Sequence, residues 1–225
     1  MHTGIAIALA WPETLCKQAG AWYDGLMNIL GFSKNNYYKV GHAAVVLIEK
    51  ESGNCFYFDF GRYHAPFGHG RVRDIETDHD LQIFTKAKVD ENKNIFNIEQ
   101  ILNELAQNEA CHGLGTLHAS FTNINFDKAY QNAKSMQEKS PWKYGPFIWS
   151  GTNCSRFVRT VILSGEPSFV EKLKLTFPYT ISPLPIGNVI SLKEYKSINT
   201  SNEINSNTNY ISEKVICQEN HCIIH

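Results

Sequence analysis

The sequence has no excess of charge of either sign, because 21 lysine and arginine residues are matched by 22 aspartate and glutamate residues. The resulting net charge of -1 gives no electrostatic basis for binding a nucleic-acid backbone. The sequence also has no long hydrophobic run, since the apolar stretch at residues 5–11 is far shorter than the roughly 20 residues of a membrane-spanning helix. We therefore expect no nucleic-acid partner and no transmembrane segment.

Cysteine is scarce and irregularly placed, at positions 16, 55, 111, 154, 217 and 222. This spacing matches neither a small disulfide-stabilised domain nor a standard zinc module. We expect reduced thiols, no metal site and no cofactor. The apolar stretch near the N-terminus has no basic residues before it, unlike a signal peptide, so we expect a buried first strand and a cytoplasmic protein.

The length and the 43% content of hydrophobic residues fit one domain with a single sizeable core. Hydrophobic periodicity predicts an α+β fold with a mainly antiparallel sheet. The expected strands cover residues 3–10, 40–48, 55–60, 81–89 and 114–122, and the expected helices cover residues 13–30, 98–107, 126–139 and a segment that begins at Cys154. From Lys193 the composition becomes polar and repetitive, which predicts a domain at 1–192 followed by a linker and tail at 193–225.

The most informative residue is Cys154, which follows a Gly-Thr-Asn turn and opens a helical pattern. At a helix N-terminus the free N–H groups and the helix dipole stabilise a thiolate, and the same amides can hold an oxyanion. The apolar face of this helix contains Cys154, Phe157, Val158, Val161 and Ile162, so the thiol should point toward the sheet. The alternative is a buried structural cysteine that packs as a small apolar residue.

A base for this thiol is expected at His42, which begins the apolar strand 40–48. The next strand, residues 55–60, follows a Lys-Glu-Ser-Gly turn, so the two strands should form a hairpin. A register that places Asp59 opposite His42, or one diagonal step away, would bring the two side chains together, whereas a slip of one residue would separate them. Asp59 would then orient His42, and His42 would take the proton of Cys154. A structural histidine and a strand-end acid remain the alternative.

These motifs resemble those of the circularly permuted NlpC-type papain-like enzymes, which include the YiiX-like and lecithin:retinol acyltransferase-like proteins. The segment Gly41-His-Ala-Ala-Val-Val46 is similar to the histidine strand of that family, and Asn153-Cys-Ser-Arg-Phe-Val158 is similar to its Asn-Cys-Glu-His-Phe-Val run. The histidine also precedes the cysteine, as in the permuted order. The resemblance implies a papain-like fold with the cysteine helix packed on the sheet. Because relatives often have another polar residue at the third catalytic position, His64 is an alternative to Asp59.

The chain as a whole resembles an uncharacterised group of proteins from Bacteroidetes-type bacteria. The similarity lies in the Ala10-Trp-Pro12 start, the segment Gly20-Ala-Trp-Tyr-Asp24 and the stretch Tyr57-Phe-Asp-Phe-Gly-Arg-Tyr-His64. This resemblance implies no particular activity.

The segment 61–73, rich in glycine, aromatic residues and arginine, would lie beside the expected triad and could line a substrate groove. Candidate substrate-binding residues are Arg62, Tyr63, His64, Trp149 and Asn153. The sequence therefore predicts a cysteine-dependent hydrolase or acyltransferase that forms a thioester from an amide or ester. Its substrate would be a peptide, a muropeptide or an acyl lipid. The alternative is a noncatalytic module that binds a peptide or lipid in the same groove.

Overall fold

The protein is described here by a computed structural model, which covers residues 2–18, 24–29, 33–35, 37–38, 40–90, 95–177 and 182–199. Its centre is a seven-stranded sheet with the order β10-β8-β1-β5-β6-β7-β9, in which all pairings are antiparallel. The strands are β1 (Gly4–Trp11), β5 (His42–Glu49), β6 (Cys55–Gly61), β7 (His69–Arg73), β8 (Leu117–Ile124), β9 (Trp142–Lys143) and β10 (Lys193–Ile198).

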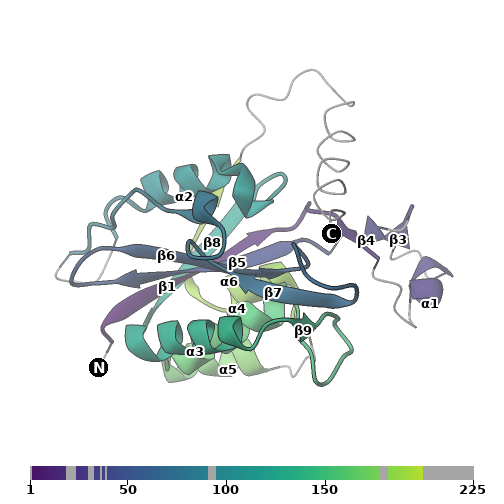
Figure 1. Ribbon diagram of the computed structural model, residues 1–225. Coiled ribbons are helices and arrows are strands. Elements are labelled where there is room, and N and C mark those ends of the chain that lie inside the picture. The colour runs from purple at the N-terminus through teal and green to yellow at the C-terminus, as the bar shows by residue number, and fades with distance from the viewer. Residues whose placement is uncertain are drawn as a thin grey trace, which may run out of the picture.

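Helices cover both faces of this sheet, with α2 (Ile98–Gln107) on one side and α3, α4 and α5 on the other (Figure 1). These three helices span Phe126–Glu138, Cys154–Ser164 and Phe169–Thr176, and the short α6 spans Pro185–Ile190. Two single 3-10 turns, η1 (His79–Leu81) and η2 (Glu109–Cys111), lie between the strands and helices. The sequence-based expectation of an α+β fold with a helix beginning at Cys154 is confirmed.

Two apolar clusters form because the side chains of each buried strand alternate between the faces of the sheet. In β5, Ala43, Val45 and Leu47 pack under α3 and α4. Ala44, Val46 and Ile48 belong to the opposite cluster, which α2 covers. The central strands are therefore apolar on both faces, and polar side chains occur mainly where these strands end.

The first predicted helix is wrong over part of its length. Instead of a helix from residue 13 to residue 30, the chain forms the short strand β2 (Cys16–Lys17) and the helix α1 (Asp24–Ile29). Strand β2 pairs with β4 (Tyr37–Tyr38), which also pairs with β3 (Ser33–Lys34). The main chain of Thr14 bonds to Trp11 and Gly41, which holds this segment against the end of β1. The prediction rested on the helical spacing of apolar residues, which carries no information about these tertiary contacts.

Two other expectations also differ from the structure. Residues 82–88 run without a strand ladder, because the amides of Phe84 and Thr85 donate to the Glu104 carboxylate. The polar segment expected to begin a linker at Lys193 forms β10, which pairs with β8 along the edge of the sheet. Residues 200–225, including the Cys217–His225 segment, lie outside the described residues.

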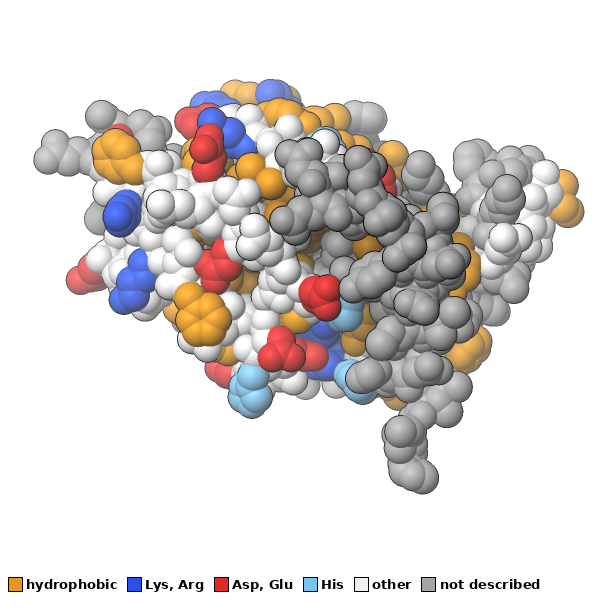
Figure 2. Space-filling view, turned by 90° about the horizontal axis from the view of Figure 1, so that it is seen from above, with side chains coloured by type: hydrophobic (Ala, Val, Ile, Leu, Met, Phe, Trp, Pro, Cys, Tyr) orange, Lys and Arg blue, Asp and Glu red, His pale blue; other side chains and the backbone are white. Residues whose placement is uncertain are grey.

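The surface seen from the α2 side intersperses acidic and basic side chains over its described part (Figure 2). This mixing agrees with the balanced composition of the chain. Among the described helices, none is both long enough and apolar enough to cross a membrane.

Candidate active site

Cys154 is the first residue of α4, and the helix begins there because Asn153 caps it. The Asn153 side chain accepts a hydrogen bond from the Arg156 amide at 2.9 Å, which satisfies one of the free N–H groups of the first turn. Phe157, Val158, Val161 and Ile162 are buried on the predicted apolar face of the helix. This packing fixes α4 on the sheet and leaves Cys154 buried, with 7% of its surface exposed.

His42 and Asp59 meet because of the register of the β5–β6 hairpin. Asp59 lies directly opposite Ala44, so His42 is its diagonal neighbour two residues along β5. The His42 Nε2 atom lies 3.1 Å from Asp59 Oδ2 in a buried contact. The hairpin and the diagonal contact expected from the sequence are both present.

The third member of the cluster is Cys154, which interacts with the His42 side chain. Burial by itself lowers the pKa of His42, but hydrogen bonds to Asp59 and Cys154 outweigh it and raise this pKa to about 9. Burial raises the pKa of Cys154, but the hydrogen bond and charge of His42 and the Ala43 amide hold it below the ordinary cysteine value. These opposite shifts favour a thiolate–imidazolium pair.

The pair forms at the end of β5, next to residues of both apolar clusters, which lie on opposite faces of the sheet. Cys154 belongs to the apolar cluster under α4, whereas Trp11, which belongs to the opposite cluster, stacks on His42 with ring centroids 6.0 Å apart. Gly41, just before the strand, has a φ of 78°. A side chain there would also come within 2.9 Å of the Trp11 carbonyl, so glycine allows the close turn that leads into His42.

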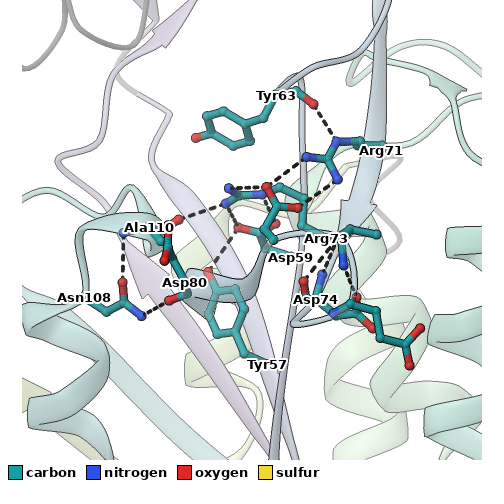
Figure 3. Close-up of polar contacts among 12 residues, drawn as sticks. Tyr57, Asp59, Tyr63, Arg71, Arg73, Asp74, Asp80, Asn108 and Ala110 are labelled. Carbon is teal, nitrogen blue, oxygen red and sulfur yellow. Dashed lines mark hydrogen bonds and ion pairs between the residues drawn. The ribbon is translucent and has the colours of Figure 1, made fainter. Parts of the chain in front are cut away.

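Asp59 is held on its other side by a buried arginine from β7 (Figure 3). Arg73 Nε donates to Asp59 Oδ1 at 2.9 Å, and Arg73 Nη2 donates to Oδ2 at 2.5 Å. The Tyr57 hydroxyl donates to the same carboxylate at 3.1 Å. Burial raises the pKa of Asp59, but the charge of Arg73 and the bonds from His42 and Arg73 outweigh it and lower this pKa well below the usual range. Asp59 is therefore ionised.

Arg73 is itself fully packed, with 2% of its surface exposed. Its guanidinium lies 4.1 Å from the centre of the Tyr63 ring and donates to the Ala110 carbonyl at 3.2 Å. These contacts satisfy a buried cation that carboxylate bonding alone would leave partly unpaired. Arg73, Asp59, His42 and Cys154 thus form a continuous buried chain of alternating charge.

This role of Arg73 is not apparent from the sequence, where Arg73 is one of several arginines in the segment 61–73. The role of Arg73 follows from the register of β6 and β7, in which Arg73 pairs directly with Asp59 and Arg71 with Gly61. A carboxylate in the middle of an apolar strand requires a cation within reach. That requirement points to an arginine opposite it, but only once the boundaries of β7 are known.

The candidate substrate-binding residues are scattered around the cluster. His64 is exposed with a φ of 51°, and the carboxylate in contact with His42 Nε2 is that of Asp59. Tyr63 is engaged by Arg73 and stacks on His112 at 4.2 Å. Arg62 lies over the Tyr144 ring. A role for any of them in substrate binding stays a prediction.

The other two candidates lie on the approach to α4. Trp149 is 75% exposed in the segment that precedes the helix, where it is free to contact a substrate. Asn153 has both ends of its side chain in use, since it caps α4 and donates to the Ser182 hydroxyl at 2.5 Å. The described contacts of Asn153 are thus those of a helix cap, and substrate contact there is also still a prediction.

Two other thiols provide a contrast with Cys154. Burial raises the pKa of Cys55 to about 11 and that of Cys111 to about 12. Neither has an imidazole hydrogen bond to offset burial. Within the described ranges, no cysteine forms a disulfide, and no group of three histidine, cysteine or acidic side chains has the arrangement of a metal site.

Replacing Arg73 with methionine should destabilise the fold by about 3–5 kcal/mol, because it leaves the buried Asp59 with the titratable His42 as its one cationic partner, beside the neutral Tyr57 hydroxyl. The matched control is Arg71→Met, two residues along the same strand, since Arg71 pairs with Asp78 at 2.8 Å in a partly exposed position. That change should cost about 1 kcal/mol or less. Urea unfolding measures both losses, and equal losses would contradict a special role for Arg73.

The pH dependence of stability should differ between the wild type and Cys154→Ala. In the wild type, the proton that Cys154 loses on folding is kept by His42. The two groups therefore have opposite effects on how the free energy of unfolding changes with pH. In Cys154→Ala only His42 remains, and a raised folded pKa stabilises fully below the unfolded value of 6.5. This contribution is lost as the pH rises toward the folded pKa, which is about 9 in the wild type and lower in the variant, because the variant keeps the bond and charge of Asp59 but lacks those of the thiolate. Urea unfolding between these limits should show a decline in the variant alone; a parallel decline in both proteins would contradict a shared proton.

The comparisons with known proteins agree with this architecture. Among curated proteins, no sequence matches this chain. The crystal structure of the type VI secretion system effector TseH matches with a TM-score of 0.55 and 15% sequence identity, over 87% of this chain and 92% of that one. TseH has a papain-like fold, and the present chain shares it. The family model described as "Type VI secretion system effector TseH-like" matches residues 6–169. The chain therefore belongs to the TseH-like family of type VI secretion system effectors.

Proposed function

We propose that the protein is a cysteine-dependent hydrolase that cleaves an amide bond in a peptide of the bacterial cell wall. The observation that carries the proposal is the buried pairing of Cys154 with His42, at the first turn of a helix and next to an ionised Asp59. A purely structural cysteine in an apolar core has a raised pKa, as Cys55 and Cys111 do. Cys154 differs from both in the direction of its shift.

The proposed reaction has two stages. The Cys154 sulfur attacks the carbonyl carbon of the scissile amide, and the main-chain N–H groups at the start of α4 stabilise the oxyanion. The His42 imidazolium then gives its proton to the leaving amine as the C–N bond breaks, which leaves a thioester on Cys154. In the second stage, neutral His42 takes a proton from water, the resulting hydroxide attacks the thioester, and the thiolate leaves as the acid product forms.

The arrangement of the site also supports the permuted NlpC-type assignment. His42 lies on a strand near the start of the chain and Cys154 on a later helix, which is the order expected from that resemblance. In this assignment Asp59 orients the histidine, and Arg73 keeps Asp59 ionised and in place.

A peptide substrate fits a secreted effector better than an internal acyl lipid does. Membership in the TseH-like effector family supports export by a type VI secretion system and action on a bacterial target. Under this proposal the protein acts outside the cytoplasm in which the sequence led us to expect it. The exposed Trp149 and the half-exposed Phe147, both in the segment before α4, offer apolar surface for a peptide near the nucleophile.

The pH profile of thiol alkylation tests the activated pair. Iodoacetamide should label Cys154 well below pH 8.5, the ordinary pKa region of cysteine, because its thiolate is stabilised. In His42→Ala the labelling at neutral pH should fall by about tenfold or more, since each unit of rise in the thiol pKa lowers the thiolate fraction tenfold. Peptide mass mapping measures the extent of alkylation at each cysteine separately.

Cys55 and Cys111 are internal controls in the same tubes, because their raised pKa values predict slow labelling in both proteins. Slow labelling of Cys154 that is independent of His42 would reject the enzyme and favour a noncatalytic module that binds a peptide at the same site.

Substrate cleavage is tested with muropeptides released from cell walls by a muramidase. The wild type should generate new amino groups, detected by mass spectrometry of the products, whereas Cys154→Ala should lose several orders of magnitude in rate because the nucleophile is absent. Cys55→Ala is the matched control and should retain activity. Hydrolysis of an acyl-lipid ester with no cleavage of muropeptides would reject the peptide substrate while leaving the activated thiol intact.

A further inference from the structure

Helix α5, in the layer of helices beneath the sheet in Figure 1, has apolar side chains on two opposite faces. On the inner face, Leu175 is buried in the core, and Glu171 accepts a hydrogen bond from the Thr122 hydroxyl of β8 at 2.7 Å. The outward face carries four further apolar residues, each between 47% and 78% exposed: Phe169, Val170, Leu173 and the C-cap Phe177. We call these four residues the α5 stripe.

The spacing of the α5 stripe places its members together on one side of the helix. A helix turns by about 100° per residue, so side chains at positions i, i+1, i+4 and i+8 fall within an arc of about 100°. Glu171 and Leu175 are buried on the opposite side. The stripe therefore does not belong to the core, and a contiguous exposed apolar patch of this kind marks an interaction surface.

Lysine side chains border the α5 stripe on both sides. By the same rotation, Lys172 lies on one side of the stripe and Lys174 on the other, and both are exposed. The one acidic residue of α5, Glu171, is buried on the inner face with 4% of its surface exposed. Glu166, which precedes the helix, is paired with Lys128 at 2.7 Å. The outward face of α5 is thus apolar in its middle and basic at both margins.

The α5 stripe is displayed on a helix that is held at both ends. Ser168 and Glu171 form a capping box at the N-terminus, which satisfies free main-chain N–H groups of the first turn. At the other end, the Ser191 hydroxyl donates to the Lys174 carbonyl at 3.3 Å, so the ends of α5 and α6 lie side by side. Ile190, which precedes Ser191, is 66% exposed and adds apolar surface at this end of α5.

We propose that the α5 stripe docks on the surface of an anionic lipid bilayer. A bilayer is layered, with negatively charged headgroups above an apolar interior, and a helix face that is apolar in its middle and basic at its margins matches both layers. Phe169, Leu173 and Phe177 enter the boundary between the headgroups and the acyl chains. Lys172 and Lys174 keep their ammonium groups at the level of the lipid phosphates.

A bilayer matches the α5 stripe better than a second copy of the chain does. Any twofold face-to-face pairing of α5 with itself, parallel or antiparallel, places the basic margins of one helix against the basic margins of the other. The one acidic side chain of the helix, Glu171, is buried on the inner face and does not neutralise them. Charge complementarity therefore favours an anionic surface as the occupant.

Co-sedimentation of the full-length protein with lipid vesicles tests this surface. One set of vesicles contains phosphatidylglycerol and phosphatidylcholine in equal amounts, and the other contains phosphatidylcholine alone. The protein should bind the neutral vesicles about tenfold or more weakly than the anionic ones, because the neutral vesicles lack the charge that Lys172 and Lys174 meet. Added salt should weaken binding to the anionic vesicles. The assay does not involve Cys154, so its outcome is independent of the proposed hydrolase activity.

Two substitutions and a matched control locate the contact. Phe169→Ser should weaken binding to the anionic vesicles by about tenfold or more, since it removes a large apolar side chain from the stripe. Lys172→Gln should weaken it by about fivefold, the contribution of one basic side chain near an anionic surface. Phe84→Ser is the control, because Phe84 is 77% exposed, against 78% for Phe169, but its neighbours Leu81 and Ala87 pack in the cluster on the other face of the sheet.

Binding to the anionic vesicles that is lost in Phe169→Ser and retained in Phe84→Ser would support the proposal. Absence of co-sedimentation with the anionic vesicles, or equal losses in Phe169→Ser and Phe84→Ser, would overturn it. A dimer that forms without lipid and that Phe169→Ser dissociates, as measured by analytical ultracentrifugation, would also overturn it and would assign the α5 stripe to a second copy of the chain.

Discussion

The buried ion pair between Arg73 and Asp59 is the constraint on which the rest of the site depends. Removing two charges from water is costly, and the cost is offset only where geometry is close and every remaining donor has a partner. Here the carboxylate receives bonds from Arg73, Tyr57 and His42, while the guanidinium also meets Tyr63 and Ala110. The pair fixes the relative positions of β6 and β7 and gives His42 an anion that does not titrate near neutral pH.

The second constraint is the location of the cluster at a strand end. Inside the sheet, β1 and β5 are apolar on both faces and offer no place for an imidazole. At the start of β5 the strand has just turned at Gly41, so His42 can contact Trp11 of one layer and Cys154 of the other. The capped start of α4 supplies the sulfur from below the sheet. Side-chain contacts of the site thus connect the layers that cover the two faces of the sheet.

Much of this arrangement could be predicted from the sequence, because it depends on local signals. The apolar alternation around Asp59, the turn before Cys55 and the cap before Cys154 are each encoded within a few residues. The role of Arg73 could not be predicted, because it depends on a register between strands separated by a loop. The segment from residue 81 to residue 89 resembles a strand in composition, yet the amides of Phe84 and Thr85 donate to Glu104 of a helix distant in sequence. Similarly, the polar residues 193–198 pair with β8 through their main chain, and amino-acid composition hardly predicts such main-chain pairing.

The alternation of charge along Arg73, Asp59, His42 and Cys154 has a consequence for the reaction cycle that we propose. In the resting state, two cations and two anions cancel. When His42 releases its proton to the leaving group and Cys154 becomes a thioester, one cation and one anion disappear together, so the enclosed cluster is still neutral. The buried cluster therefore holds no uncompensated charge before or after acylation of Cys154. Because the interior screens charge weakly, this balance avoids the free-energy cost of burying an unpaired charge at either stage.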